Sequence, residues 1–201
     1  MILEGTKPAL VLVDVQRGAL MGATGIPHMG GAATRIERDR ELVAAARAAG
    51  VPVVFIQEVH KRTLTDFGRE LDGAEGIHAL EGDESTELAE GLEPGPDEYL
   101  IRKRRYSAFF QTELELVLRS YGVDTVLLVG GLTDVCIHYT AMDAHQRDLY
   151  VRVIEDCVGG SSHEAHVAAL RAIEYLQRDA LVRSEDVLEE LRALAAERAP
   201  A

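Results

Sequence analysis

Residues 126–144, VLLVGGLTDVCIHYTAMDA, decide how this chain folds. An apolar run long enough for one strand ends at two glycines, and a helical pattern begins a few residues later. A strand that turns into a helix in this way is typical of an α/β fold. Cys136 stands where the helical part starts. Its thiol could be a nucleophile at a strand-to-helix turn or a small apolar group in a core, and other parts of the chain must decide between the two.

Strand-like runs alternate with helical patterns along the whole sequence. The predicted strands are 8–14, 51–59, 98–103, 123–130, 149–156 and a weaker one at 180–184. These runs are almost continuously apolar, which indicates strands covered on both faces. The pattern predicts a three-layer α/β/α sandwich, with a Rossmann-like, doubly wound parallel sheet of five or six strands. We expect residues 1–201 to form a single domain.

Four helices are predicted between and after the strands, each from an apolar stripe with helical spacing. The first covers 34–49, with Ile36, Leu42, Val43 and Ala46 inward; the second covers 111–122, with Leu114, Val117, Leu118 and Tyr121 inward and Gly122 as its stop. The third covers 162–177, with Ala165, Ala169, Ala172, Ile173 and Leu176 inward. The last covers 184–199, with Ser184 as its N-cap.

Residues 60–97 show no clear strand or helix pattern and interrupt the alternation of strands and helices. A segment so long and irregular is typical of an active-site loop or lid, or else of a surface insertion.

Composition excludes several classes of partner. The net charge of −13 and the pI near 4.9 disfavour nucleic acid and anionic lipid, since the one basic run is RKRR at 102–105. No signal peptide is recognisable and no segment is apolar enough to cross a bilayer. Two cysteines do not make a disulfide framework. We expect a cytoplasmic protein that binds neither nucleic acid nor membrane.

Three residues with complementary chemistry stand at or just beyond predicted strand ends. They are Asp14, Lys103 and Cys136. In parallel sheets ligands bind beyond the carboxyl ends of the strands, so these side chains could converge. A buried carboxylate can take the proton of a thiol, and an ammonium group can stabilise both anions. The amides at the start of the following helix are expected to favour the thiolate further.

Each of the three residues also has an ordinary structural interpretation. An aspartate at a strand end is often a helix cap, a lysine there is usually solvated, and a cysteine among apolar residues is usually inert. Histidine is the other base that could activate a thiol. His138 lies two residues from Cys136 and so points to another side of the helix, and His145 is more than two turns away.

The chain resembles the isochorismatase-like cysteine hydrolases, through LVDVQRG (12–18), KRRYSAFFQTELELVL (103–118) and GGLTDVCIHYTAMDA (130–144). The resemblance implies a catalytic triad of Asp14, Lys103 and Cys136, and a cis peptide bond at Gly131–Leu132. It also implies an oxyanion hole formed by the amides of Leu132 and Cys136. Cys136 would attack an amide carbonyl, Asp14 would shuttle the proton, and water would hydrolyse the resulting thioester.

The resemblance also separates branches of this family. Isochorismatases proper lack the cysteine, which favours an amide substrate here. Nicotinamidases stack their ring on aromatic side chains that DVQRGAL (14–20) and GAEGIHAL (73–80) do not supply. They also bind a metal through an Asp-x-His pair and a further histidine; Glu58, His60 and His78 are weak candidates, but the middle histidine is missing, so we expect no metal and no cofactor.

The carbamoyl branch fits better, because KRRYSAFFQT (103–112) is similar to the Lys-x-Arg-Tyr-Ser pattern of ureidoacrylate and carbamoyl hydrolases. The expected activity is cleavage of the C–N bond of a small polar carbamoyl or ureido amide, such as biuret, ureidoacrylate or an N-carbamoyl amino acid, with release of ammonia. Candidate substrate-binding residues are Gln16, Arg17, Tyr106, Thr133 and Tyr139. The resemblance implies a homodimer or homotetramer.

Other functions remain open from sequence. Within the family they are a nicotinamidase, a lactam-type amide hydrolase and a catalytically silent binding protein. Outside it, the basic run 102–105 could be an interaction module. The second cysteine, Cys157, has no matching lysine or family position and is expected to be an ordinary buried thiol.

Overall fold

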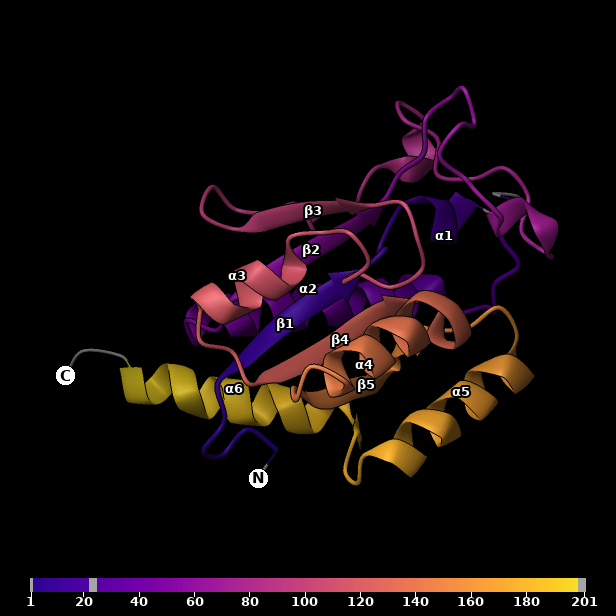
Figure 1. Ribbon diagram of the computed structural model, residues 1–201. Helices are drawn as coiled ribbons and strands as arrows, with labels where there is room; N and C mark the ends of the chain where they lie inside the picture. The colour runs from indigo at the N-terminus through magenta and orange to yellow at the C-terminus, as the bar shows by residue number, and fades with distance from the viewer. Residues whose placement is uncertain (1, 22–24, 199–201) are drawn as a thin grey trace.

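The computed structural model describes residues 2–21 and 25–198. Six parallel strands form one sheet in the order β3-β2-β1-β4-β5-β6 (Figure 1). The strands are β1 (Pro8–Val13), β2 (Val53–Glu58), β3 (Tyr99–Lys103), β4 (Thr125–Gly131), β5 (Tyr150–Gly159) and β6 (Leu181–Val182). The helices are α1 (Gly18–Met21), α2 (Ala32–Ala48), α3 (Leu114–Ser120), α4 (His138–His145), α5 (His163–Leu176) and α6 (Ser184–Arg198). The predicted doubly wound α/β/α sandwich is confirmed.

Helices cover both faces of the sheet, because alternate side chains of each strand point to opposite faces. On β1, Ala9, Val11 and Val13 join the core beneath α3, α4 and α5, whereas Leu10 and Leu12 join the core beneath α2 and α6 (Figure 1). All five side chains are at most 1% exposed. Burial on this scale contributes about 1.5–3 kcal/mol for each large apolar side chain.

The strand order places a topological switch point beside β1. The chain winds outward from β1 through β2 to β3, then returns and winds the other way from β4 to β6. Loops after β1 and β4 therefore leave the sheet in opposite directions, and a crevice opens between them at the carboxyl ends of the strands. Asp14 follows β1 and Cys136 follows β4 at this crevice.

Some predicted details are wrong, mostly near helix ends. Tyr121 and Leu176 were expected inward, but they are 44% and 48% exposed because each lies at or beyond the last turn of its helix. Leu170 is buried in α5 instead. Ser184 is not an N-cap: it is the first residue of α6, and its amide and hydroxyl both donate to the carboxylate of Asp156.

Residues 60–97 contain two short 3-10 turns, Glu70–Asp72 and Glu84–Thr86. Isolated bridges tie His60 to Leu80 and Gln16 to Leu88, so the segment folds back over the end of the sheet.

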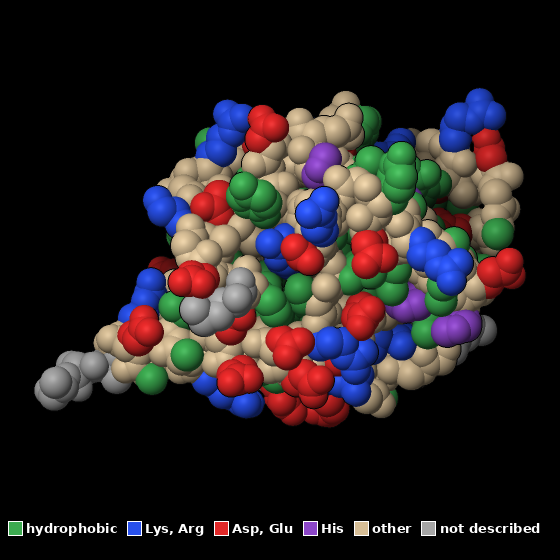
Figure 2. All heavy atoms as spheres, turned by 90° about the horizontal axis from the view of Figure 1, so that it is seen from below, with side chains coloured by type: hydrophobic (Ala, Val, Ile, Leu, Met, Phe, Trp, Pro, Cys, Tyr) green, Lys and Arg blue, Asp and Glu red, His purple; other side chains and the backbone are tan. Residues whose placement is uncertain are grey.

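No helix among residues 2–21 and 25–198 combines the length and the apolar character that crossing a bilayer requires. On the face seen in Figure 2, acidic and basic side chains are intermingled and form no continuous basic surface.

Candidate active site

The fold brings Asp14, Lys103 and Cys136 together. Lys103 Nζ lies 2.8 Å from Asp14 Oδ2 and 3.3 Å from Cys136 Sγ. The strands that carry them are not all neighbours, because β2 separates β1 from β3. The long lysine side chain spans that gap and is 1% exposed. Asp14 adopts a left-handed backbone conformation, with φ of 54°, at the point where the chain leaves β1. Non-glycine residues with such φ values are uncommon and cluster at functional sites.

Glu58 is a fourth member that the sequence analysis did not place beside the triad. It ends β2, pairs in register with Lys103, and accepts a hydrogen bond of 2.8 Å from Lys103 Nζ at Oε2. The same oxygen lies 3.7 Å from Cys136 Sγ. One ammonium group thus pairs with two carboxylates, Asp14 and Glu58. The pKa of Lys103 is well above its usual value: burial alone would lower it, but the charges of Asp14, Cys136 and Glu58 outweigh burial.

The two carboxylates have opposite pKa shifts. Burial raises the pKa of Asp14 to about 6; Lys103 opposes the rise and the charge of Glu58 adds to it. Burial would also raise the pKa of Glu58, but the charge of Lys103 and hydrogen bonds from His60, His78 and Lys103 hold it well below its usual value. When the surroundings of two carboxyl groups shift their pKa values in opposite directions, one group can act as a base while the other stays charged. Asp14 is the carboxylate able to take a proton, and Glu58 remains ionised.

The pKa of the Cys136 thiol is raised overall, although Lys103 lowers it as the sequence analysis expected. Burial raises the pKa of Cys136 well above its usual value; Lys103 lowers it, but Asp14 and Glu58 raise it again. The expectation omitted Glu58, whose charge offsets the lysine. Neither oxygen of Asp14 accepts a hydrogen bond of good geometry from a described residue. The carboxylate is therefore held by charge and remains able to accept the thiol proton.

The turn that carries Cys136 brings two backbone amides to the cavity. The Gly131–Leu132 peptide bond is cis, and residues Thr133–Ile137 form a π-helical turn before α4. Leu132, which precedes this turn, donates its N–H to no backbone carbonyl of a described residue. Leu132 and Cys136 line the same cavity. Backbone amides beside a candidate nucleophile are the donors that an oxyanion would need.

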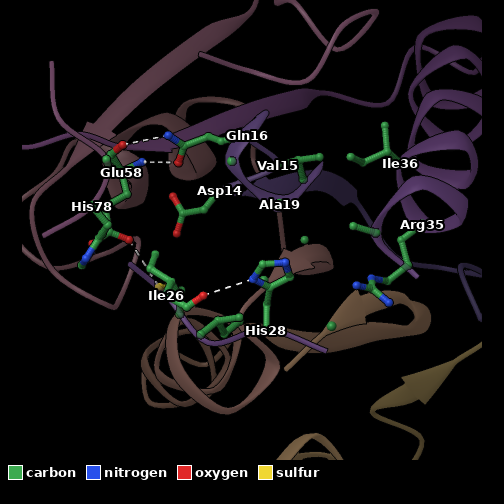
Figure 3. A pocket seen from close by; sticks show the side chains of 18 of the residues that line it. Asp14, Val15, Gln16, Ala19, Ile26, His28, Arg35, Ile36, Glu58 and His78 are labelled. Atoms are coloured by element: carbon green, nitrogen blue, oxygen red, sulfur yellow. Dashed lines mark hydrogen bonds and ion pairs between the residues drawn. The ribbon is translucent and has the colours of Figure 1, made fainter. Parts of the chain in front are cut away.

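The cavity at these strand ends has a volume of about 130 Å³. That is room for a molecule of roughly six to ten heavy atoms. The 60–97 loop contributes Glu75, His78, Ala79 and Ser85 to its lining, which supports the prediction of a binding loop. Figure 3 shows Asp14 between Glu58 and His78 on one side and Arg35 on the other.

The structure separates the candidate substrate-binding residues into two groups. Gln16 and Tyr106 line the cavity, but the amide of Gln16 is occupied: it bonds to Glu58 and to Thr86 O. Arg17, Thr133 and Tyr139 are outside the lining. Thr133 Oγ1 lies 2.9 Å from His166 Nδ1, and Tyr139 stacks on Tyr106 at a separate surface hollow.

Sequence reasoning missed four other lining residues, His28, Arg35, Asp39 and Cys157. Of these four residues, only Asp39 could have been noticed in the sequence. It is an acidic residue on the apolar, inward side of α2, between Ile36 and Leu42. Cys157 is fully buried, as expected, yet it borders the cavity. The pKa of its thiol is raised, first by burial and then by the charge of Asp39.

A buried cluster of ionisable groups lies behind Glu58. His60 Nε2 is 3.3 Å from Glu58 Oε1 and 3.2 Å from Glu70 Oε2, and His78 Nε2 is 3.5 Å from Glu58 Oε1. Both Glu70 oxygens and His60 Nδ1 are buried without a hydrogen bond to a described residue. Sequence reasoning named Glu58, His60 and His78 but missed Glu70, which a short turn of the 60–97 loop supplies.

These four side chains fit a divalent cation. Each offers one donor atom, all four donors lie within 4.8 Å of one another, and two imidazole nitrogens with two carboxylate oxygens suit zinc or manganese. A cation held there would supply fixed positive charge behind Glu58. The expectation of no metal rested on a missing histidine and did not include Glu70.

Without a bound cation, a protonated His60 supplies positive charge between the carboxylates of Glu58 and Glu70. Burial would lower the pKa of His60, but hydrogen bonds and charges from Glu58 and Glu70 raise it to about 9. The folded protein therefore binds a proton at His60 more tightly than the unfolded protein does, whose histidine pKa is about 6.5. The resulting stabilisation is fully present below pH 6.5 and is lost as the pH rises through 9. In chelator-treated protein, we expect the unfolding free energy to fall by on the order of 2 kcal/mol between pH 6.5 and 9.5.

Urea unfolding at the two pH values measures this fall, and a His60→Asn variant should show a smaller one. An NMR titration of the imidazole, assigned by loss of its signal in the variant, should give a midpoint near 9. A midpoint at or below 6.5 would show that the cluster does not hold a proton there.

Three of the four residues of the basic run 102–105 make internal contacts, whereas Arg102 is exposed. Lys103 is buried in the triad, Arg104 Nε pairs with Asp66 Oδ2 at 2.8 Å, and Arg105 Nη1 donates to Asp66 O at 2.6 Å. These arginines fasten the 60–97 loop to the end of β3. Such contacts leave little of the run free for an external polyanion.

Comparisons with known proteins identify the family of this chain. The Isochorismatase domain model matches residues 8–186. The chain is 32% identical to maleamate amidohydrolase of Pseudomonas putida, over 95% of this chain and 90% of that protein. It is 30% identical to ureidoacrylate amidohydrolase RutB of Pantoea ananatis, over 84% and 76%.

A solved structure also matches across nearly the whole fold. It is N-carbamoylsarcosine amidase from Thermoplasma acidophilum, with a TM-score of 0.73 and 28% identity, covering 89% of this chain and 97% of that one. The family model spans most of the chain and includes Asp14, Lys103 and Cys136. The chain therefore belongs to the isochorismatase family.

Proposed function

We propose that this chain is a cysteine amidohydrolase that cleaves the C–N bond of a small carbamoyl or ureido amide and releases ammonia. The observation that carries the proposal is Lys103 Nζ, which lies within 2.8 Å of Asp14, 2.8 Å of Glu58 and 3.3 Å of Cys136. These groups surround a cavity sized for a small substrate. The names of the three relatives reported above, maleamate amidohydrolase, ureidoacrylate amidohydrolase and N-carbamoylsarcosine amidase, support the same chemistry.

The first half-reaction forms a thioester. Asp14 takes the proton of Cys136 as the sulfur attacks the amide carbonyl carbon, which gives a tetrahedral oxyanion. The N–H groups of Leu132 and Cys136, both at the cavity, would donate to that oxyanion. Asp14 then gives the proton to the leaving nitrogen, the C–N bond breaks, and ammonia departs.

The second half-reaction restores the thiol. Asp14 takes a proton from water, whose oxygen attacks the thioester carbonyl, and the C–S bond breaks as the proton passes to sulfur. Lys103 and Glu58 keep the same charge throughout, so the lysine balances each anion that forms on Asp14 or Cys136. A cation behind Glu58 would supply further fixed charge without taking part in these transfers.

An ammonia assay on a panel of amides tests the proposal. The panel holds biuret, ureidoacrylate, N-carbamoylglycine, maleamate and nicotinamide. We expect rapid ammonia release from at least one of the acyclic compounds. Nicotinamide should be poor, because Tyr106 is the one Phe or Tyr among the described lining residues. Silence across the panel would contradict the proposal, and opening of a lactam ring without ammonia would support a lactam hydrolase instead.

The pH dependence of kcat/KM should follow Asp14. Burial raises the pKa of Asp14 to about 6, so below pH 6 the carboxyl is protonated and cannot take the thiol proton. We expect kcat/KM to fall about tenfold per pH unit below 6 and to stay level from pH 7 to 8.5. Circular dichroism at each pH separates this loss from unfolding. A rise in activity centred above pH 8 would show that ionisation of the free thiol controls the reaction.

A further inference from the structure

The cavity has a second charged end, opposite the Glu58 side, that the proposed reaction does not use. Arg35 extends from α2 into this end (Figure 3). Its guanidinium lies over Gly159 so closely that a Cβ there would sit 2.5 Å from Nη2. Its hydrogen bonds go to backbone carbonyls, Gly30 O at 2.8 Å and Met29 O at 3.4 Å. None of the ion pairs between described residues includes Arg35.

The surroundings of Arg35 do not cancel its charge. The nearest acidic group is Asp39, one turn along α2, which is 1% exposed and whose Oδ1 is buried without a hydrogen bond to a described residue. Burial raises the pKa of Asp39 to about 8, although Cys157 and Arg35 lower it. The carboxyl is therefore largely protonated at neutral pH. Arg35 remains a half-buried cation facing the cavity.

The positive groups at the opposite end of the cavity already have partners. Lys103 lies against Asp14 and Glu58, His60 against Glu58 and Glu70, and His78 against Glu58. Glu75 adds a further acidic group to the lining near His78. Arg35 is the one arginine or lysine among the described lining residues, so an anionic group of a substrate is best held at the Arg35 end.

The sheet fixes the separation of the two ends. Gly159, beneath the guanidinium, is paired with Gly131, which immediately precedes the amide of Leu132. Neighbouring strands lie about 5 Å apart, so the backbones that carry the two ends are side by side. Arg35 and Cys136 line the same cavity, so one small molecule within it can contact both side chains.

We propose that Arg35 determines specificity by binding a carboxylate of the substrate whose amide lies at Cys136. The substrate class is then half-amides of short dicarboxylic acids and N-carbamoyl amino acids. A planar guanidinium suits a carboxylate because it can donate two parallel hydrogen bonds. This inference rests on the proposed amide hydrolysis.

Matched pairs of substrates test it. Succinamate is compared with butanamide, and N-carbamoylglycine with ethylurea; in each pair a methyl group replaces the carboxylate. For Arg35→Gln we expect kcat/KM for the acids to fall about 30-fold or more, mainly through KM, and kcat/KM for the neutral partners to change less than about threefold. Arg40→Gln, on the same helix but bonded to Glu90 O outside the cavity, is the control and should change neither.

A binding measurement keeps the inference separate from catalysis. Calorimetry with Cys136→Ala protein should give a succinamate Kd that rises about 30-fold when Arg35→Gln is added and that Arg35→Lys raises less. If Arg35→Gln lowered kcat/KM equally for the acids and the neutral amides, or left the succinamate Kd unchanged, the role of Arg35 would be overturned. If wild-type protein releases no ammonia from any panel compound, the proposed hydrolysis fails, and the Kd comparison still decides whether Arg35 binds the carboxylate.

Discussion

Replacing Cys136 by alanine should lower kcat for amide hydrolysis by at least about 10⁴-fold. The residue supplies the only thiol within reach of both Lys103 Nζ and Glu58 among the described residues. Without the sulfur, no thioester forms, and the remaining amides and Lys103 can only polarise the carbonyl. Initial rates of ammonia release, measured with the best compound of the panel, give the comparison.

Cys136→Ser is the matched control, because it keeps the size of the side chain and replaces the sulfur with a poorer nucleophile. We expect it to be nearly as inactive as the alanine variant, with an unfolding free energy within about 1.5 kcal/mol of wild type. Retention of a tenth of the wild-type rate by either variant would mean that Cys136 is core filler and that another group attacks the substrate.

Replacing Gly130 by alanine should destabilise the fold by more than about 4 kcal/mol or prevent folding. The residue has φ of 113°, and a Cβ there would lie 1.9 Å from Val13 O on the paired strand β1. The contact is with backbone in the middle of the sheet, so relief requires that β1 and β4 separate. The Asp14 and Cys136 ends of those strands would move apart with them.

Gly122→Ala provides the control for the backbone angle. Gly122 also has a positive φ, 66°, but nothing lies within 4 Å of the added carbon. We expect it to cost about 1 kcal/mol. Urea unfolding of both variants separates the two effects: a similar small cost for both would show that the close approach of β1 to β4 is not required.

The fold and the convergence of Asp14, Lys103 and Cys136 could be predicted because each depends on local pattern. Apolar runs and helical stripes marked the strands and helices, and polar residues directly after those runs marked the carboxyl edge of the sheet. Convergence of Asp14 and Cys136 then followed from topology. The lysine was found by the same logic, although it reaches across β2 rather than from a neighbouring strand.

The rest of the site depends on contacts that no local pattern encodes. Glu58 is the residue in register with Lys103, and only the strand order reveals that one ammonium serves two carboxylates. The charge of Glu58 also opposes the effect of Lys103 on the pKa of the Cys136 thiol, and the sequence analysis did not include it. Glu70 and Arg35 enter the site through loop folding and the packing of α2 on the sheet, which depend on the whole core.

The most direct test of the account is to look for the acyl group on Cys136. Protein mixed with an excess of its best substrate is acid-quenched at times through the first turnover, digested and analysed by mass spectrometry. We expect a transient mass increase equal to the substrate's acyl group on the peptide that contains Cys136, sensitive to hydroxylamine as a thioester is, and absent from Cys136→Ser. Ammonia released through the first turnover with Cys136 unmodified, or an adduct on Cys157 instead, would contradict nucleophilic catalysis by Cys136.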